Sequence, residues 1–195
     1  AALDEPFSNL LTQGMVLNEI FYRKPASGRI VYYNPADVDV QLDEKGARIG
    51  AVLRADGESV ESGGIGTMSK SKSNGVDPDK LVERYGADTA RLFMMFAAPP
   101  EQTLEWSDEG VDGAFRFMKR LWKAVHQHLQ GGPLEASLDK AALSPAQRDM
   151  RRQVHETLAR ISNDIGRRRT FNTAIAAVME LMNGLAKFDD RSAQG

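Results

Sequence analysis

Hydrophobic residues follow two different patterns along this chain, and the change comes near residue 78. Between residues 18 and 62, short runs rich in β-branched and aromatic residues alternate with Gly, Pro, Asn and Asp. Runs of that length with such breaks predict a small antiparallel sheet with tight turns. Residues 7–17 predict a short helix, a turn at Gly14 and a strand from 15 to 17. The first part of the chain is therefore expected to hold a β-rich insertion beside one core strand.

Beyond residue 78, apolar positions recur every three or four residues, which is the period of an amphipathic helix. Asp77 is expected to cap the first helix, Pro78 to take its first position and Gly86 to end it. Asp88 lies near the start of a second helix, which should stop before the two prolines at 99 and 100. This segment thus predicts two short helices in succession.

Three longer amphipathic helices are predicted after residue 107, with Ser107 and Ser144 as caps of the first two and Gly131 as the end of the first. Their apolar faces are Val111, Ala114, Phe115, Met118, Leu121, Trp122, Val125 and Leu129, then Val154, Leu158, Ile161 and Ile165, then Phe171, Ile175, Val178, Met182 and Leu185. We assign the stripe around Trp122 to a packed core rather than to a cofactor site. Helices with short connections form bundles. The predicted fold class is α+β, a small antiparallel β insertion next to a core strand, followed by a mainly α-helical bundle.

Composition narrows the class of protein. The 195 residues include no cysteine, which excludes disulfides and thiolate metal sites and fits a reducing compartment. The three histidines show no metal-ligand spacing with acidic partners, so no metal site is predicted. No apolar run approaches the ~20 residues of a membrane span, and the N-terminus lacks the pattern of a signal peptide. Both ends are expected to be cuts in a longer, cytoplasmic protein.

Charge is distributed unevenly along the chain. Residues 1–65 carry six basic and ten acidic side chains, whereas residues 111–195 carry fourteen and nine. A basic C-terminal part indicates a polyanionic partner, and the alternative is an ordinary solvated helical surface.

The segment "GGIGTMSKSKSNGVDP", residues 63–78, combines small residues with lysines. Gly64, Lys70 and Ser71 have the spacing of a P-loop, but Ser69 replaces its second glycine and no helix is predicted at the lysine. A P-loop also needs backbone N–H groups at a helix N-terminus. The better hypothesis is a mobile loop that brings Lys70 and Lys72 to phosphate oxygens when pyrophosphate leaves. The alternative is a linker.

The residues "TMSKS", 67–71, resemble the KMSKS signature of class I aminoacyl-tRNA synthetases. The stretch from there to Trp122, together with "QGMVL" upstream and "RRRTFNTAIAAVMELMN" downstream, resembles bacterial leucyl-tRNA synthetases in particular. That resemblance implies a catalytic-core remnant at 1–17, a leucine-specific insertion at 18–62, the KMSKS loop with stem-contact helices at 63–106, and part of the anticodon-binding domain at 107–195. It also implies ATP with Mg²⁺, leucine and tRNA-Leu as ligands of a monomeric enzyme without membrane attachment.

Within this resemblance Lys70 takes the place of the second KMSKS lysine and is the expected catalytic residue. Its neighbours Met68, Ser69, Ser71 and Lys72 are expected at the ATP phosphates as well. Thr67 replaces the first lysine of the signature, and we hypothesise that Lys72 compensates for the lost charge. The HIGH-type signature, the editing domain and the zinc module of the family do not occur, so this chain alone is expected to be inactive.

The residues expected to contact tRNA are Arg116, Lys119, Arg120, Lys123, Arg151, Arg152, Arg160, Arg167, Arg168 and Arg169. Such contacts to phosphates position RNA without reading its sequence. Two other interpretations remain open at this point. One is a sister synthetase for isoleucine, valine or methionine, which the β insertion directly before the loop disfavours. The other is a non-catalytic RNA-binding module in which the lysine segment is a linker.

Overall fold

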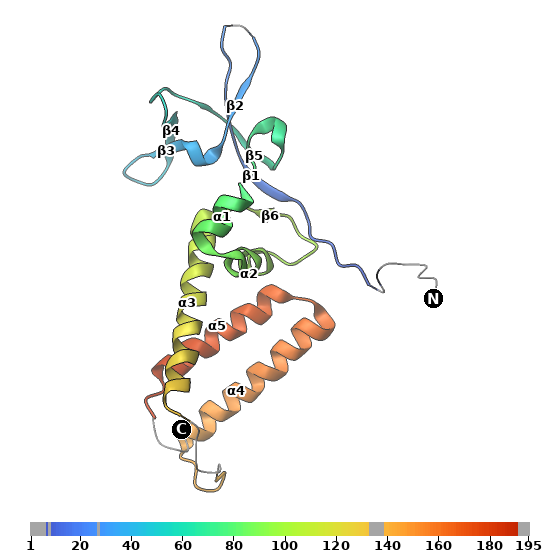
Figure 1. Ribbon diagram of the computed structural model, residues 1–195, viewed down its shortest axis with the longest axis vertical. Coiled ribbons are helices and arrows are strands. Elements are labelled where there is room, and N and C mark those ends of the chain that lie inside the picture. Colours follow the sequence, from blue (N-terminus) through green and yellow to red (C-terminus); the bar gives the residue numbers. More distant parts are fainter. Residues whose placement is uncertain (1–6, 8, 27, 133–138, 191–195) are drawn as a thin grey trace. The chain divides into compact units, whose positions relative to one another are not determined.

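The structure is a computed structural model that describes residues 7, 9–26, 28–132 and 139–190 (Figure 1). The chain divides into two compact units. The first comprises residues 1–84 and 101–107, and the second comprises residues 85–100 and 108–195. Each unit is described by itself below.

The first unit is built around strand β1 (Val16–Arg23), which pairs along both of its edges. On one edge it is antiparallel to β5 (Glu61–Thr67), with Leu17 opposite Thr67. On the other edge it pairs with β2 (Val31–Tyr33) in antiparallel fashion and with β6 (Leu104–Glu105) in parallel. Strand β1 therefore joins the β-rich segment to strand β6, which begins 81 residues after β1 ends.

A second, two-stranded sheet completes this unit. It consists of β3 (Val38–Leu42) and β4 (Arg48–Leu53), preceded by the 3-10 turn η1 (Pro35–Asp37). The buried side chains between the two sheets form one cluster of Phe21, Val38, Ala51, Leu53 and Val60. The prediction of short antiparallel strands over this region is confirmed.

An ion pair closes the loop after β4. The guanidinium of Arg23 donates two hydrogen bonds to the carboxylate of Asp56, at 2.7 and 2.9 Å. This hydrogen bonding to Arg23 is the main reason that the pKa of Asp56 falls from 3.8 to about 2.

The prediction of a short helix before Gly14 is wrong for the residues that the structure describes. Phe7 and residues 9–15 have no helical conformation, and Phe7, Leu10 and Leu11 are exposed. A helix this short is unstable without an apolar surface to pack on, and the exposure of these side chains shows that none is supplied. The strand expected at 15–17 does form, but it starts at Val16 and continues to Arg23.

The helices after residue 77 start where the caps predict. Helix α1 (Pro78–Tyr85) begins after Asp77, whose carboxylate accepts from the N–H of Asp79 at 3.0 Å. Helix α4 (Pro145–Asn163) begins after Ser144, which forms a complete capping box with Gln147. Between them lie α2 (Ala87–Ala97) and α3 (Asp108–Gln130).

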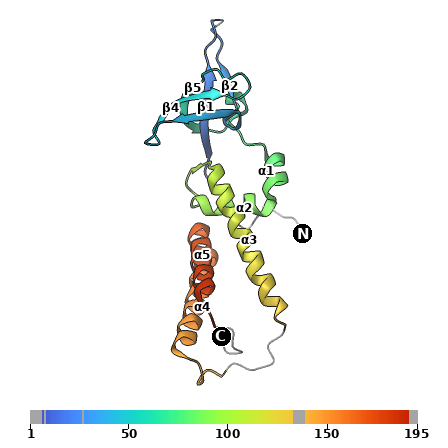
Figure 2. The same ribbon diagram turned by 90° about the vertical axis from the view of Figure 1, so that its left-hand side faces the viewer.

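In the second unit α2 packs against α3 and α5 (Phe171–Lys187), and α4 packs against α5 (Figure 2). A π-helical turn, η3 (Asp164–Arg168), extends α4 toward α5. The connection from α3 to α4 runs from 131 to 144 and is longer than the short loops expected of a bundle.

The apolar stripe predicted on α3 is only partly a core. Val111 and Ala114 of the stripe are buried, together with Phe117, which the predicted stripe did not include. Trp122 is 77% exposed, and Val125 and Leu129 are exposed too. The reason is one of length. Helix α2 has 11 residues and spans about 16 Å, while α3 has 23 residues and spans about 35 Å. The shorter helix covers only the first half of the longer one. Leu158 on α4 and Ile165 on η3 were predicted on the apolar face of one helix, and both are also exposed.

Candidate functional site

The lysine loop follows directly from strand β5. The N–H of Met68 still bonds to the carbonyl of Val16 at 3.0 Å, so the strand pairing reaches the first residue of the loop. Lys70–Lys72 then form the single 3-10 turn η2, whose two backbone bonds are 3.3 Å long. Ser73 closes this turn with a φ of 51°, a left-handed conformation that costs a non-glycine residue on the order of 1 kcal/mol.

This geometry differs from a P-loop, as expected. The strand that leads into the loop is exposed, unlike the buried strand of a P-loop, and the following helix begins only at Pro78. No run of helical N–H groups therefore surrounds the lysines. The loop presents side chains instead of backbone donors to a ligand.

The two lysines of the loop lie differently. Lys70 is exposed at the start of η2. Lys72 is half-buried, and its Nζ lies 3.8 Å from the place where a side chain on Gly66 would begin. The hydroxyls of Ser69 and Ser71 lie 3.3 Å apart beside them. Lys70 is thus the more accessible charge, and Lys72 lies against the base of the loop.

Three asparagines that sequence reasoning did not single out surround this loop. Asn74 is completely buried, and its side chain contacts both ends of the loop. Asn18 on β1 and Asn34 before η1 donate to the carbonyls of Asn74 and Gly75, at 3.1 and 3.0 Å. The only signal in the sequence was the Asn74-Gly75 pair, which is usually typical of an exposed turn.

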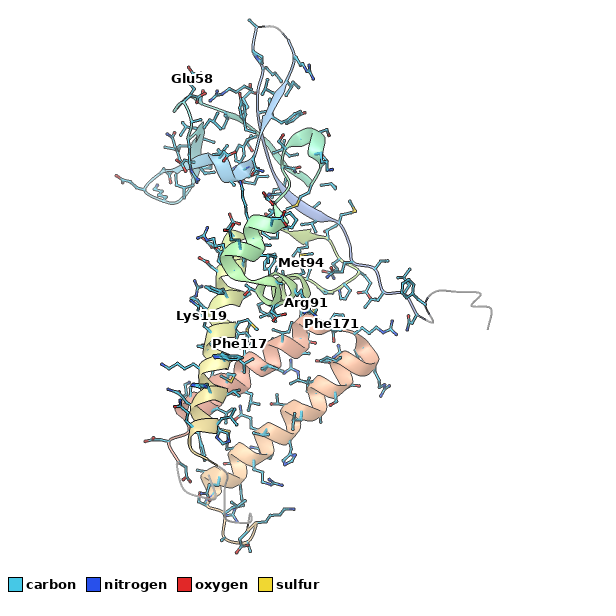
Figure 3. The ribbon with its side chains drawn as sticks, in the orientation of Figure 1. Glu58, Arg91, Met94, Phe117, Lys119 and Phe171 are labelled. Carbon is cyan, nitrogen blue, oxygen red and sulfur yellow. The ribbon has the colours of Figure 1, made fainter. Side chains whose placement is uncertain are left out.

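The basic residues of α3 share one face, because 116, 119, 120 and 123 follow helical spacing. All four are exposed (Figure 3 labels Lys119). The ammonium of Lys119 lies 4.1 Å from the ring centre of Phe115, and Arg120 donates to Asn183 on α5 at 3.4 Å. Arg116 and Lys123 form no ion pair with any residue that the structure describes.

The basic residues of α4 are more strongly paired. Arg152 lies within 3.5 Å of Asp149 and 3.3 Å of Glu156, and Arg160 lies 3.5 Å from Glu180. Arg151 is half-buried. Exposed pairs of this kind contribute little to stability, so a phosphate could replace their acidic partners.

Asp164 organises the turn that carries the arginine triplet. Its side chain is 1% exposed and accepts from the Thr173 hydroxyl and from Arg168, both at 2.8 Å. These two donors, Thr173 first, hold the pKa of Asp164 below its ordinary value. Arg169, which follows Arg168, has a left-handed φ of 56°. Arg167 and Arg168 therefore lie on a π-helical turn tied to a buried carboxylate, and Arg169 is the residue that ends this turn.

The structure brings the candidate residues into separate groups. Residues 68–72 lie together in the lysine loop of the first unit, whereas all the candidate RNA contacts lie in the second unit. The described part of the chain contains no group of three His, Asp or Glu side chains able to hold a metal ion. Among the same residues, none of the helices combines the length and hydropathy needed to cross a membrane.

Comparison with known proteins connects this arrangement to one family. The family model described as tRNA synthetases class I (I, L, M and V) matches residues 60–107, which include the whole lysine loop. The leucine–tRNA ligase of Nitrosospira multiformis is 70% identical over 190 residues, 97% of this chain and 22% of its own length. That of Chromohalobacter salexigens is 62% identical over 194 residues, 100% of this chain and 22% of its own length.

A solved structure agrees with these matches. LeuRS from Agrobacterium radiobacter K84, in a ternary complex with tRNA and LeuAMS, has a TM-score of 0.57 and 25% identity, over 66% of this chain and 17% of its own. The chain thus spans about a fifth of the length of the relatives it matches. The sequence matches run through nearly all of its residues, so the chain is similar along its length to one segment of the leucine–tRNA ligases, and residues 60–107 match the model of the class I tRNA synthetases.

Proposed function

We propose that this chain supplies the phosphate-handling loop and part of the tRNA-docking surface of a leucine–tRNA ligase. In the reaction, a carboxylate oxygen of leucine attacks the α-phosphorus of ATP, and the bond from that phosphorus to the bridging oxygen breaks. Pyrophosphate leaves, and the leucyl group then passes to the terminal ribose of tRNA-Leu. The observation that carries the proposal is the exposed Lys70 at the start of a short turn, within a segment that matches the family model.

Lys70 has a defined electrostatic task in this scheme. Negative charge grows on the pyrophosphate oxygens as the bond breaks, and an ammonium that contacts them best at that moment lowers the barrier. Ser69 and Ser71 can donate hydrogen bonds to the same oxygens. Lys72 lies at the base of the loop, and we propose that it replaces the charge lost at Thr67. ATP is used with Mg²⁺ in this proposal, but we assign no step to the ion because the described residues offer no ligand cluster for it.

The second part of the proposal concerns tRNA. The basic faces of α3 and η3 offer the exposed residues Arg116, Lys123 and Arg167, which have no ion pair within the described part of the chain. Side chains of this kind bind phosphates and release counterions, so tRNA affinity should fall steeply with salt. We also propose that the enzyme is a monomer and is located in the cytoplasm.

The test uses a complete enzyme in which this chain replaces the matching segment of the Nitrosospira multiformis ligase. Leucine-dependent exchange of pyrophosphate into ATP reports the first step alone. Lys70→Ala should lower the exchange rate by roughly a hundredfold to a thousandfold, as expected for the loss of one transition-state contact. Lys80→Ala on α1, another exposed lysine, is the matched control and should leave the rate unchanged.

The same assay separates the remaining alternatives. Unchanged exchange in Lys70→Ala would mean that the segment is a linker, and the proposal would fail. Lys72→Ala should reduce exchange, and Thr67→Lys should restore much of the loss. If Lys72→Ala alone leaves exchange intact, the compensating role of Lys72 is wrong.

A further inference from the structure

The amide side chain of Asn74 holds the lysine loop by both of its ends. Its Oδ1 accepts from the N–H of Ser69 at 2.8 Å, just before η2. Its Nδ2 lies 3.3 and 3.4 Å from the carbonyls of Gly66 and Thr67, at the end of β5. Asn74 itself follows η2, so a single side chain spans the loop that contains Lys70.

Asn74 is in turn anchored to strand β1 through a reciprocal pair. Its Nδ2 lies 3.4 Å from the carbonyl of Asn18, and the Nδ2 of Asn18 donates to the carbonyl of Asn74 at 3.1 Å. Asn74 has no exposed surface, and Asn18 is buried as well. A buried amide that finds partners for both its oxygen and its nitrogen rigidifies what it touches, and it is costly to replace.

The chemistry of this position requires an asparagine. The side chain must accept one N–H and donate toward three carbonyls at a fixed, short reach. An aspartate of the same shape would direct a charged oxygen at those carbonyls in a fully buried site. An apolar side chain would leave the Ser69 N–H without a partner.

We propose that Asn74 is a positioning residue for Lys70 in the activation step, acting through the loop rather than on ATP. The turn η2 is held by two long backbone bonds, and Ser73, which closes it, has a left-handed φ. The turn therefore needs fixed ends to keep Lys70 in one place. The side chain of Asn74, which follows the turn, binds the backbone that precedes the turn at Gly66, Thr67 and Ser69. The pairing of Asn74 with Asn18 ties both parts to β1. This inference rests on the proposed role of Lys70, and the experiment below distinguishes failure of the one from failure of the other.

The experiment is a double-mutant cycle in the complete ligase that carries this chain, with leucine-dependent pyrophosphate exchange as the readout. Asn74→Asp should lower kcat by roughly tenfold to a hundredfold, because a shift of about 1 Å in a reacting group can cost that much. The KM for leucine should not change. In the Lys70→Ala background the same substitution should cost less than twofold, since two residues that act through one contact are not additive. Asn163→Asp, an exposed asparagine on α4, is the matched control.

Each outcome decides between specific alternatives. If Lys70→Ala is inactive and Asn74→Asp is as active as wild type, the positioning role is wrong while the function of Lys70 stands. If the two losses multiply, Asn74 acts on something other than Lys70, and the inference is overturned. If Lys70→Ala is fully active, the proposed function fails first.

A second variant and a second measurement guard against misfolding. Should Asn74→Asp give no folded enzyme, Asn18→Ala removes the bond to the Asn74 carbonyl but keeps the Asn74 side chain. It should lower kcat by about tenfold, again only when Lys70 is present. Amide hydrogen exchange of the segment 66–76 in the complete ligase should become faster in both variants. Exchange as slow as in wild type would show that the loop is held by other contacts and would contradict the inference.

Discussion

The two aromatic side chains Phe117 and Trp122 offer a direct test of where the core of the second unit ends. Both lie on α3, five residues apart, yet Phe117 is 5% exposed and Trp122 is 77% exposed. Replacement of each by alanine in the 195-residue chain should therefore have very different effects on the free energy of unfolding.

The magnitudes follow from burial. A buried phenylalanine truncated to alanine loses its transfer free energy and leaves a cavity, which together cost about 3–5 kcal/mol. Trp122 buries roughly a quarter of its surface, or about 60 Å² out of ~250 Å². At about 25 cal/mol per Å² this corresponds to only about 1.5 kcal/mol, an upper value because the unfolded chain also buries some apolar surface.

Urea denaturation followed by far-UV circular dichroism measures both values, since the second unit is helical. A pair of curves taken at two protein concentrations controls for self-association through the exposed stripe. An equal loss for both variants, independent of concentration, would refute the reasoning, because it would mean that the C-terminal half of α3 is packed within the chain.

Three further predictions concern charge. Asp56, whose pKa is lowered to about 2, adds stability that is fully present above about pH 4 and is lost as the pH falls toward 2. Asp56→Asn should remove that acid-dependent loss, which thermal melts across this range would reveal. Asp164→Asn should weaken tRNA binding by the complete ligase several-fold without changing its salt dependence, because no phosphate contact is removed. Arg167→Ala should reduce the slope of log affinity against log salt by about one, and an unchanged slope would exclude a phosphate contact at this residue.

Local signals in the sequence predicted the helix starts correctly. In the structure Asp77 and Ser144 cap helices α1 and α4, and Pro78 and Pro145 are the first residues of these helices. These positions could be predicted because capping depends on residues only a few positions apart. The strand pattern of the first unit was equally readable. The arginine triplet lies between two predicted apolar helix faces in the sequence. In the structure α4 continues into a π-helical turn over Asp164–Arg168, where Asp164 pairs with Arg168 and Thr173.

What the sequence did not predict depends on distant partners. The glycines at 63, 64 and 66 were assigned to a loop, yet they lie within the seven-residue strand β5 because β1 supplies the pairing. Asn74 resembled an exposed turn residue, and its burial depends on Asn18, 56 residues earlier. Helical spacing placed Trp122 on the apolar face of α3, but it does not indicate how far the partner helix α2 extends along that face. The position of Lys70 in the loop was predicted, while the residues that hold it were not.

The shared strand β1 sets a limit on how this protein can be shortened. Its first residues pair with β6 and with the end of β5, and its last residues pair with β2 and with the start of β5. A deletion of residues 18–62 would remove most of this strand, Asn18 included. The excisable module is instead the segment between Arg23 and Glu61, whose ends are brought together by β-sheet pairing of Tyr22 with Glu61. A two-residue turn grafted at that junction would convert β1 and β5 into one continuous hairpin and leave the strand that supports the lysine loop in place.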